Sequence, residues 1–255
     1  MGGLTVLLGS LVACTGSPAG PLPTGAGTNP ALPVQPRATA TDTGSAAATP
    51  SPAPPNVIGM GIDLALSRMQ VAGCSVTAEH IVNAAGTRAG QVFGQQVISG
   101  YCEVALSVSA GPPPTSVAAC RSLAVHQGRG GVAGGNFGAA LIFRNTGSAP
   151  CALRGYPDLS EQHNKKTVTA RHTAQGYLGG SGEPLVTYVL FPGDSVSASY
   201  EASDNPPAGQ NSCPAGSTTL VTAGGHTTTL PGLGSPCSGL EIHPYVPGST
   251  GSDVR

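Results

Sequence analysis

The stretch LVTYVLFPGDSVSASY, residues 185–200, has the pattern of two β-strands separated by a turn. Residues 185–191 form an apolar run, and residues 195–200 alternate between small polar and apolar side chains. Pro192 and Gly193 are the residue types that a tight turn favours between strands. Alternation with a period of two residues predicts a region built of strands rather than helices.

The same kind of pattern extends over residues 115–255. Further strands are predicted at residues 139–144, 218–222, 226–230 and 240–243. Glycine and proline separate these strands, and no stretch has helical spacing. About seven short strands with such punctuation favour a β-sandwich of the immunoglobulin-like kind.

Residues 54–111 form a separate, smaller α+β module in this interpretation. Apolar residues recur at helical spacing from Ile62 to Met69, and Gly73 stands where a helix would end. Strands are predicted on both sides of this helix, at residues 56–60, 75–77 and 103–109. The whole chain is therefore expected to be mainly β.

Seven cysteines in a chain with only 9% charged residues indicate an oxidising, extracytoplasmic compartment. Cys74 and Cys102 are the two cysteines of the small module, and we expect them to form a disulfide. Such a bridge would add about 3 kcal/mol to a module whose hydrophobic burial is marginal. Four cysteines in the larger region predict two more disulfides, with all three pairings open: Cys120, Cys151, Cys213 and Cys237.

Residues 4–13 are a short apolar or small stretch directly before Cys14. The stretch is too short to span a bilayer but fits a secretory signal, so residues 1–13 are predicted to be a signal peptide. Residues 11–14, Leu-Val-Ala-Cys, resemble a bacterial lipobox, which implies a lipid anchor on Cys14. The alternative is an ordinary signal peptide with a chance cysteine. The first basic residue is Arg37, so we expect the true start codon to lie upstream.

Residues 14–53 carry the lipidated cysteine and a linker rich in Pro, Thr and Ala. This composition offers too little apolar surface to offset the entropy of ordering, so a disordered tether is expected. The predicted location is the outer face of the cell membrane, with the lipid anchor as the membrane contact.

Composition excludes several classes of protein. The formal net charge is −1, so the basic footprint typical of a nucleic-acid-binding protein is missing from the sequence. The longest apolar runs fall short of the 18 or so residues that a transmembrane helix needs. We expect no nucleic-acid partner and no membrane-spanning helix.

The small module resembles a PASTA domain, the wall-facing module of bacterial Ser/Thr kinases and penicillin-binding proteins. The resemblance rests on residues 55–60, 65–73, 90–92 with Gln95 and Gly100, and 108–111, although Val97 stands where that family usually has proline. It implies that the module binds peptidoglycan fragments. A spacer without binding activity is the alternative.

The larger region resembles the domain of unknown function 4232, which is common in secreted and lipid-anchored actinobacterial proteins. The matching landmarks are Cys120, residues 130–135, 143–157, 190–194, Cys213, Cys237 and residues 244–248. No activity is established for that family, so the resemblance implies a fold and a compartment rather than a mechanism.

Known catalytic patterns are weak in this sequence. Gly128-x-Gly130-x-x-Ala133 lacks the following helix of a dinucleotide loop, and residues 179–182 lack the last glycine of a nucleophile elbow. Six histidines are widely separated, which favours scattered surface groups over a metal site: His80, His126, His163, His172, His226 and His243. Five carboxylates could in principle act as an acid–base pair, but no spacing marks them: Asp158, Glu161, Glu183, Asp194 and Glu201. We expect no catalytic residues, metal or cofactor.

The expected function is that of a non-catalytic cell-envelope lipoprotein. Its partner would be cell-wall peptidoglycan or a wall-associated protein. The alternative is an extracytoplasmic carrier or receptor for a small hydrophobic or sugar ligand, which an apolar pocket of several hundred Å³ would support.

Overall fold

The computed structural model describes residues 53–163, 166–177, 185–206, 208–213, 218–234 and 237–251. Residues 1–47 and 48–255 are separate units, and the second unit contains all the described residues. The predicted signal peptide, the Cys14 anchor and nearly all of the predicted linker lie outside the described residues. The single helix of the described residues has ten residues, and no helix there is long and apolar enough to cross a bilayer.

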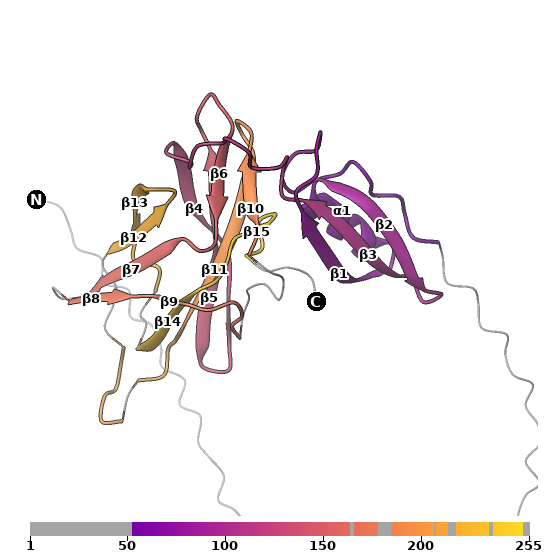
Figure 1. The fold of residues 1–255 in the computed structure, drawn as a ribbon. Helices are drawn as coiled ribbons and strands as arrows, with labels where there is room; N and C mark the ends of the chain where they lie inside the picture. The colour runs from indigo at the N-terminus through magenta and orange to yellow at the C-terminus, as the bar shows by residue number, and fades with distance from the viewer. Residues whose placement is uncertain are drawn as a thin grey trace, which may run out of the picture. The chain divides into compact units, whose positions relative to one another are not determined.

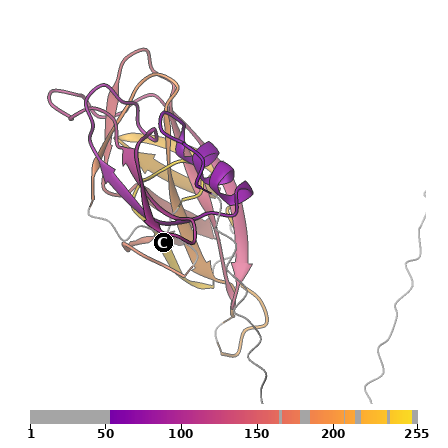
Figure 2. The same cartoon turned by 90° about the vertical axis from the view of Figure 1, so that its right-hand side faces the viewer.

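The small module consists of one helix and a three-stranded sheet, shown in Figures 1 and 2. The helix is α1 (Ile62–Val71), and the strands are β1 (Ser75–Val82), β2 (Val92–Ser99) and β3 (Glu103–Ser109). Strand β3 lies in the centre, parallel to β1 and antiparallel to β2. The module therefore has the predicted mixture of helix and strands.

The core of the small module lies between α1 and its sheet. Ile62, Ala65 and Met69 are buried at helical spacing in the same cluster as Val104 and Leu106 of β3. The helix ends as expected, because Gly73 adopts φ +72° and its N–H donates to the carbonyl of Gln70 at 3.0 Å. The disulfide between Cys74 and Cys102 then ties the end of the helix to the start of β3.

The strand predicted at residues 56–60 is wrong. The Asn56 side chain accepts the N–H of Ile58 at 3.0 Å, and Gly59 adopts φ +86°. A side chain that bonds its own backbone two residues on, followed by a glycine at positive φ, makes a turn instead of an extended strand.

The larger region contains two main sheets and a two-stranded ribbon (Figure 1). The main path of the six-stranded sheet is β4 (Leu123–Ala133), β5 (Asn136–Asn145), β11 (Ser195–Ser203), β14 (Ser238–Ile242) and β9 (Arg171–His172), with β15 (Val246–Pro247) paired to β11. The four-stranded sheet has the order β13 (His226–Pro231), β12 (Thr218–Ala223), β7 (Asp158–His163) and β8 (Lys166–Thr169). The ribbon pairs β10 (Thr187–Leu190) with β6 (Cys151–Arg154).

One hydrophobic cluster joins these sheets. Phe143 and Tyr200 from the six-stranded sheet belong to the same buried cluster as Leu159 and Val221 from the four-stranded sheet. Phe143 also meets the ring of Tyr245 edge-on, with 5.2 Å between ring centroids. The prediction of a mainly β chain is confirmed, and the apolar face of each main sheet contributes to a common core.

The turn at residues 191–194 joins two different sheets. Pro192 and Gly193 form the predicted turn, in which Gly193 has φ +87° and Asp194 donates its N–H to the carbonyl of Phe191 at 2.9 Å. However, β10 pairs with β6, whereas β11 pairs with β5 and β14. The chain thus changes sheets at this turn.

Strand β4 was not predicted, because three glycines interrupt its pattern. A Cβ on Gly130 would lie 2.8 Å from the carbonyl oxygen of Gly138 on β5, so glycine permits a close approach of the two strands there. The register also shifts between Gln127 and Gly130, as in a β-bulge. The glycines that interrupt the alternating pattern therefore allow the close pairing of β4 with β5.

Candidate functional site

The small module and the larger region meet through backbone and side-chain contacts. Val189 of β10 donates its N–H to the carbonyl of Ala110 at 2.8 Å. The Asn83 side chain donates to the carbonyl of Thr187 at 2.9 Å. Ile81 and Ala110 of the small module are buried in the main core cluster. The two parts therefore share apolar packing as well as hydrogen bonds.

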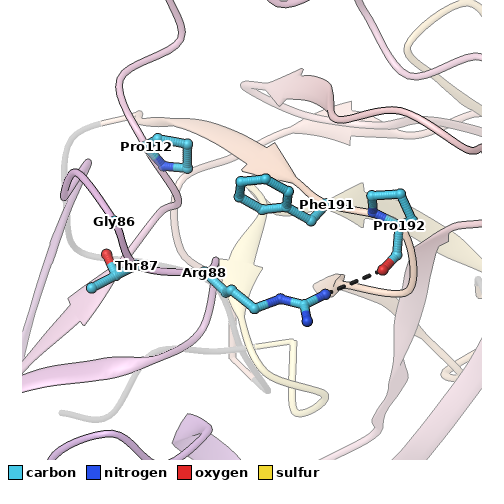
Figure 3. A pocket seen from close by; sticks show the side chains of 6 residues that line it. All are labelled: Gly86, Thr87, Arg88, Pro112, Phe191 and Pro192. Carbon is cyan, nitrogen blue, oxygen red and sulfur yellow. Dashed lines mark hydrogen bonds between the residues drawn. The ribbon is translucent and has the colours of Figure 1, made fainter.

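A cleft of about 410 Å³ lies beside these contacts (Figure 3). Its walls come from residues 86–88 of the small module, Pro112, and Phe191 and Pro192 of the larger region. Figure 3 shows the Arg88 side chain reaching toward Pro192, whose carbonyl accepts a hydrogen bond from Nη2 at 3.1 Å. The guanidinium carbon also lies 5.9 Å from the centroid of the Phe191 ring, within the range of a cation–π contact.

Asp194 fixes the position of Arg88. One oxygen of the Asp194 carboxylate pairs with Arg88 Nη2, and the other accepts the N–H of Phe191 at 3.0 Å. The Asp194 side chain is only 9% exposed, whereas that of Arg88 is 58% exposed. The turn at residues 191–194 thus holds a largely buried carboxylate that orients an exposed guanidinium.

Thr87 anchors the opposite wall of the cleft. Its hydroxyl donates to the carbonyl of Ala84 at 2.7 Å and lies 2.7 Å from the hydroxyl oxygen of Ser109. Gly86 adopts φ +77°, which allows the chain to turn directly before Thr87. The backbone that carries Arg88 is therefore fixed to β3.

Two further hollows lie near the cleft. One, of about 500 Å³, is lined by Ala89 and Gly193, which follow Arg88 and Pro192 in the chain. The other, of about 760 Å³, shares Asp63, His126, Ile142 and Ser249 with it and continues to Arg129.

We call these three hollows together the seam groove. Asp63 of the small module connects the two parts of the protein at the groove, because its Oδ1 accepts the N–H of Ser249 at 3.1 Å. The groove combines an oriented guanidinium and exposed polar groups with an apolar wall at Phe191. Such a surface can hold a ligand by hydrogen bonds and apolar contact.

The structure settles the disulfide pairing that the sequence left open. Cys120 pairs with Cys151, and Cys213 pairs with Cys237. The first bridge is buried in the main core, because Cys120 and Cys151 are 0% and 8% exposed. Cys213 belongs to an exposed segment beyond β11.

The carboxylates considered as an acid–base pair have structural partners where they are described. Glu161 is fully buried and accepts the N–H of Leu233 at 3.1 Å. Asp158 lies 3.2 Å from the ring nitrogen of His172. Glu183 lies outside the described residues.

The expectation of scattered surface histidines is wrong for His243. His243 is 0% exposed, whereas His80, His126 and His172 are exposed. Its ring lies close to two carboxylates, because one ligand atom from each of Glu201, Glu241 and His243 lies within 4.8 Å of the others. We call these three residues the buried polar cluster.

Two buried tyrosines near the core have strongly shifted acidities. Burial raises the pKa of the Tyr200 hydroxyl well above its usual value, and the charge of Glu161 adds to this effect. Tyr200 donates to the carbonyl of Leu233 at 3.0 Å and accepts a bond from Gln127 at 2.8 Å. Burial likewise raises the pKa of Tyr245, with the charge of Asp158 as the smaller cause.

The glycine-rich sequence at residues 128–133 belongs to strand β4, and the next element is strand β5. A dinucleotide-binding loop would instead lead into a helix. Gly134 and Gly135 form the turn to β5, both at positive φ, which suits a two-residue hairpin. The other glycine-rich segment, residues 179–182, lies outside the described residues.

Sequence reasoning missed the residues of the seam groove. Arg88 and Asp194 are more than 100 residues apart, so no local spacing connects them. Only the Pro-Gly-Asp turn at residues 192–194 could have been singled out from the sequence. Its partner on the small module depends on how the two parts pack.

Comparison with known proteins gives one family. Residues 118–244 match the family described as Domain of unknown function (DUF4232). No curated protein matches the chain. The match covers strands from both main sheets and includes Cys120, Cys151, Cys213 and Cys237. The chain therefore carries a DUF4232 domain at residues 118–244.

Proposed function

We propose that this protein is a non-catalytic cell-envelope lipoprotein whose seam groove binds cell-wall peptidoglycan. Cys14 carries the lipid anchor in this proposal, and residues 14–53 are the tether. Residues 54–111 act as a PASTA-like module, and residues 115–255 act as an immunoglobulin-like sandwich.

The observation that carries the proposal is the oriented Arg88 in the cleft at Phe191. Peptidoglycan offers sugar hydroxyls, N-acetyl groups and peptide carboxylates. The exposed guanidinium of Arg88 can donate to the oxygens of these groups, and the face of Phe191 can pack against apolar parts of the polymer. The nearby hollows provide room for a ligand longer than one sugar unit.

The experiment is co-sedimentation of the protein with purified, insoluble peptidoglycan at low and high salt. The full chain is used with Cys14→Ser, so that it stays soluble without lipid. Arg88→Gln removes the guanidinium at the cleft. Arg154→Gln is the matched control, because Arg154 is also exposed but lines none of the three hollows.

The proposal predicts retention of the parent protein and of Arg154→Gln at both salt concentrations. Arg88→Gln should bind about tenfold more weakly, as expected when a hydrogen bond from a charged donor is lost. Equal retention of Arg88→Gln would remove the groove from the proposal.

Absence of retention by the parent would overturn wall binding. The same variants would then be tested with small hydrophobic and sugar ligands, because the cleft of about 410 Å³ also suits a carrier or receptor. The lipid anchor has a separate test: Cys14→Ala in the natural host should release the protein from the membrane fraction.

A further inference from the structure

Three charged residues lie in one row across the six-stranded sheet. Glu201 of β11 is directly opposite Glu241 of β14, and Glu241 is directly opposite Arg171 of β9. Residues opposite one another on neighbouring strands place their side chains on the same face, so two carboxylates are adjacent there. Adjacent like charges are unfavourable unless a cation lies between or beside them.

Arg171 balances the charge of Glu241. It pairs with Oε1 of Glu241, whose Oε2 accepts the hydroxyl of Thr173 at 3.0 Å. The Arg171 side chain is 72% exposed, so water weakens its effect on the deeper Glu201. Glu201 has a side chain that is only 10% exposed and accepts the N–H of Tyr177 at 2.7 Å.

His243 faces the same two carboxylates. It follows Glu241 by two residues, which places both on one side of the extended chain. Its Nδ1 lies 3.0 Å from the carbonyl oxygen of Thr173. A carbonyl can only accept a hydrogen bond, so this contact places the proton on Nδ1 and the lone pair of the neutral ring on Nε2.

The Nε2 atom of His243 is fully buried and makes no hydrogen bond to any of the described residues. It lies 3.9 Å from Oε1 of Glu201, too far for a direct hydrogen bond between them. A buried nitrogen lone pair beside two carboxylates is the donor set of a divalent-cation site. The carbonyl on Nδ1 is the outer contact that ring nitrogens of metal-ligating histidines usually make.

Gly176 closes the cluster on the side of the Tyr177 segment. A Cβ at this position would lie 2.0 Å from Oε1 of Glu201 and 2.5 Å from Nε2 of His243. The backbone of Gly176 is not at positive φ, so the local turn does not require glycine. Glycine instead leaves the space in front of these two atoms free of a side chain.

We infer that Glu201, Glu241 and His243 form a binding site for one divalent transition-metal ion, with Zn²⁺ as the test ion. One imidazole nitrogen and two carboxylate oxygens fit the ligands that Zn²⁺ takes in proteins. Glu241 and Arg171 lie at the more exposed edge of the cluster. This site is independent of the seam groove and of the function proposed for it.

The charge of Arg171 gives the inference a second signature. Arg171 competes with the metal ion for Glu241, and its positive charge also repels the ion. Loss of the Arg171 side chain should therefore tighten metal binding. A cluster with a purely structural role would show no such gain. Arg171→Gln changes an exposed side chain, so this variant should fold.

The test measures Zn²⁺ binding to the full chain by calorimetry, with metal content after dialysis as a second readout. Cys14→Ser is present in every sample, because a free thiolate would itself bind zinc. The other six cysteines are in disulfides. His80→Asn is the control, since His80 is an exposed histidine of the small module.

The parent and His80→Asn should each bind one Zn²⁺ with equal affinity. His243→Asn should weaken binding by about 100-fold or more, because loss of a ligand exceeds the loss found for outer contacts. Gly176→Ala should also weaken binding, and Arg171→Gln should tighten it several-fold. Co²⁺ in place of Zn²⁺ should give visible absorption bands that His243→Asn abolishes.

Absence of stoichiometric zinc in the parent would overturn the inference. Unchanged affinity in both His243→Asn and Arg171→Gln would also overturn it, because the ion would then lie elsewhere. If His243→Asn fails to fold, Arg171→Gln decides, since tighter binding supports the site and unchanged binding refutes it.

Discussion

The seam groove and the buried polar cluster both contain charged side chains, but these side chains differ in their exposure to water. In the groove, Arg88 is mostly exposed and one carboxylate orients it. In the cluster, Glu201 and His243 are almost withdrawn from water. An exposed charge can be removed at little cost in stability, whereas a buried one cannot. The two sites can therefore be separated by experiment, because only substitutions in the cluster should also lower the stability of the fold.

The two sites also differ in how much they depend on the core of the small module. One wall of the groove belongs to the small module, whose core cluster contains the Cys74–Cys102 bridge. The buried polar cluster belongs to the six-stranded sheet of the larger region. Damage to the small module should thus affect the groove and leave the cluster intact.

The largest expected effect is that of Glu201→Ala. This change removes the acceptor of the Tyr177 N–H and leaves a cavity beside the buried His243 and the half-buried Glu241. Urea unfolding should show a loss of about 4 kcal/mol, because a hydrogen bond to a charged acceptor is lost and a cavity is left at a nearly buried position. A loss below about 1 kcal/mol would mean that the cluster behaves like the exposed charges of the groove.

The next effect is that of opening the bridge in the small module. Cys74→Ser with Cys102→Ser removes a cross-link that spans 28 residues and should lower the stability of the module by about 3 kcal/mol. Peptidoglycan retention should fall because the Arg88 wall loosens. Zinc binding at the cluster should stay unchanged, and a parallel loss of both activities would contradict the independence of the two sites.

Alkaline pH tests a buried group that carries no charge in the folded protein. Burial raises the pKa of Tyr245 far above the value of about 10 expected in the unfolded chain. The stabilising effect of the protonated hydroxyl is therefore complete below pH 10 and declines above it, because only the unfolded chain then releases the proton. The decline is about 1.4 kcal/mol per pH unit for one tyrosine.

Tyr245→Phe should reduce this decline in unfolding experiments between about pH 9 and pH 12. The variant should change stability little at pH 7, because the buried Tyr245 hydroxyl makes no hydrogen bond within the described residues. An equally steep decline in Tyr245→Phe would assign the alkaline sensitivity to other groups.

The smallest expected effect on stability is that of Arg88→Gln. The ion pair with Asp194 is exposed on the arginine side, so unfolding by urea should shift by less than about 1 kcal/mol. A larger loss would show that Arg88 joins the two parts of the protein, and its effect on peptidoglycan retention would then lose its meaning as evidence for a binding contact.

Local sequence patterns predicted those helices and strands that residues close in the sequence determine. The helix at Ile62–Val71 ends before Gly73, as expected, and the alternating residues Glu103–Ser109 form β3 with the predicted bounds. The strand predicted at residues 56–60 is wrong because Asn56 and Gly59 favour a turn, although the segment contains several apolar residues. Strand β4 was missed because its glycines serve pairing with β5, which the sequence does not reveal.

The candidate sites depend on long-range pairing and could not be predicted in this way. Glu201 and Glu241 become neighbours only because β11 pairs with β14, and Arg171 joins them only because β9 pairs with β14. Arg88 meets Asp194 only through packing of the small module beside the turn at residues 191–194. Alternation identified β11 but gave no information about its partners.

The most direct test of the central claim is hydrogen–deuterium exchange of the full chain carrying Cys14→Ser, with and without soluble disaccharide–peptide fragments of peptidoglycan. The account predicts slower exchange at residues 86–90 and 191–194 when the fragments are present, with no change around Glu201 and His243. Unchanged exchange at both segments, or protection confined to the buried polar cluster, would contradict the assignment of the seam groove as the binding site.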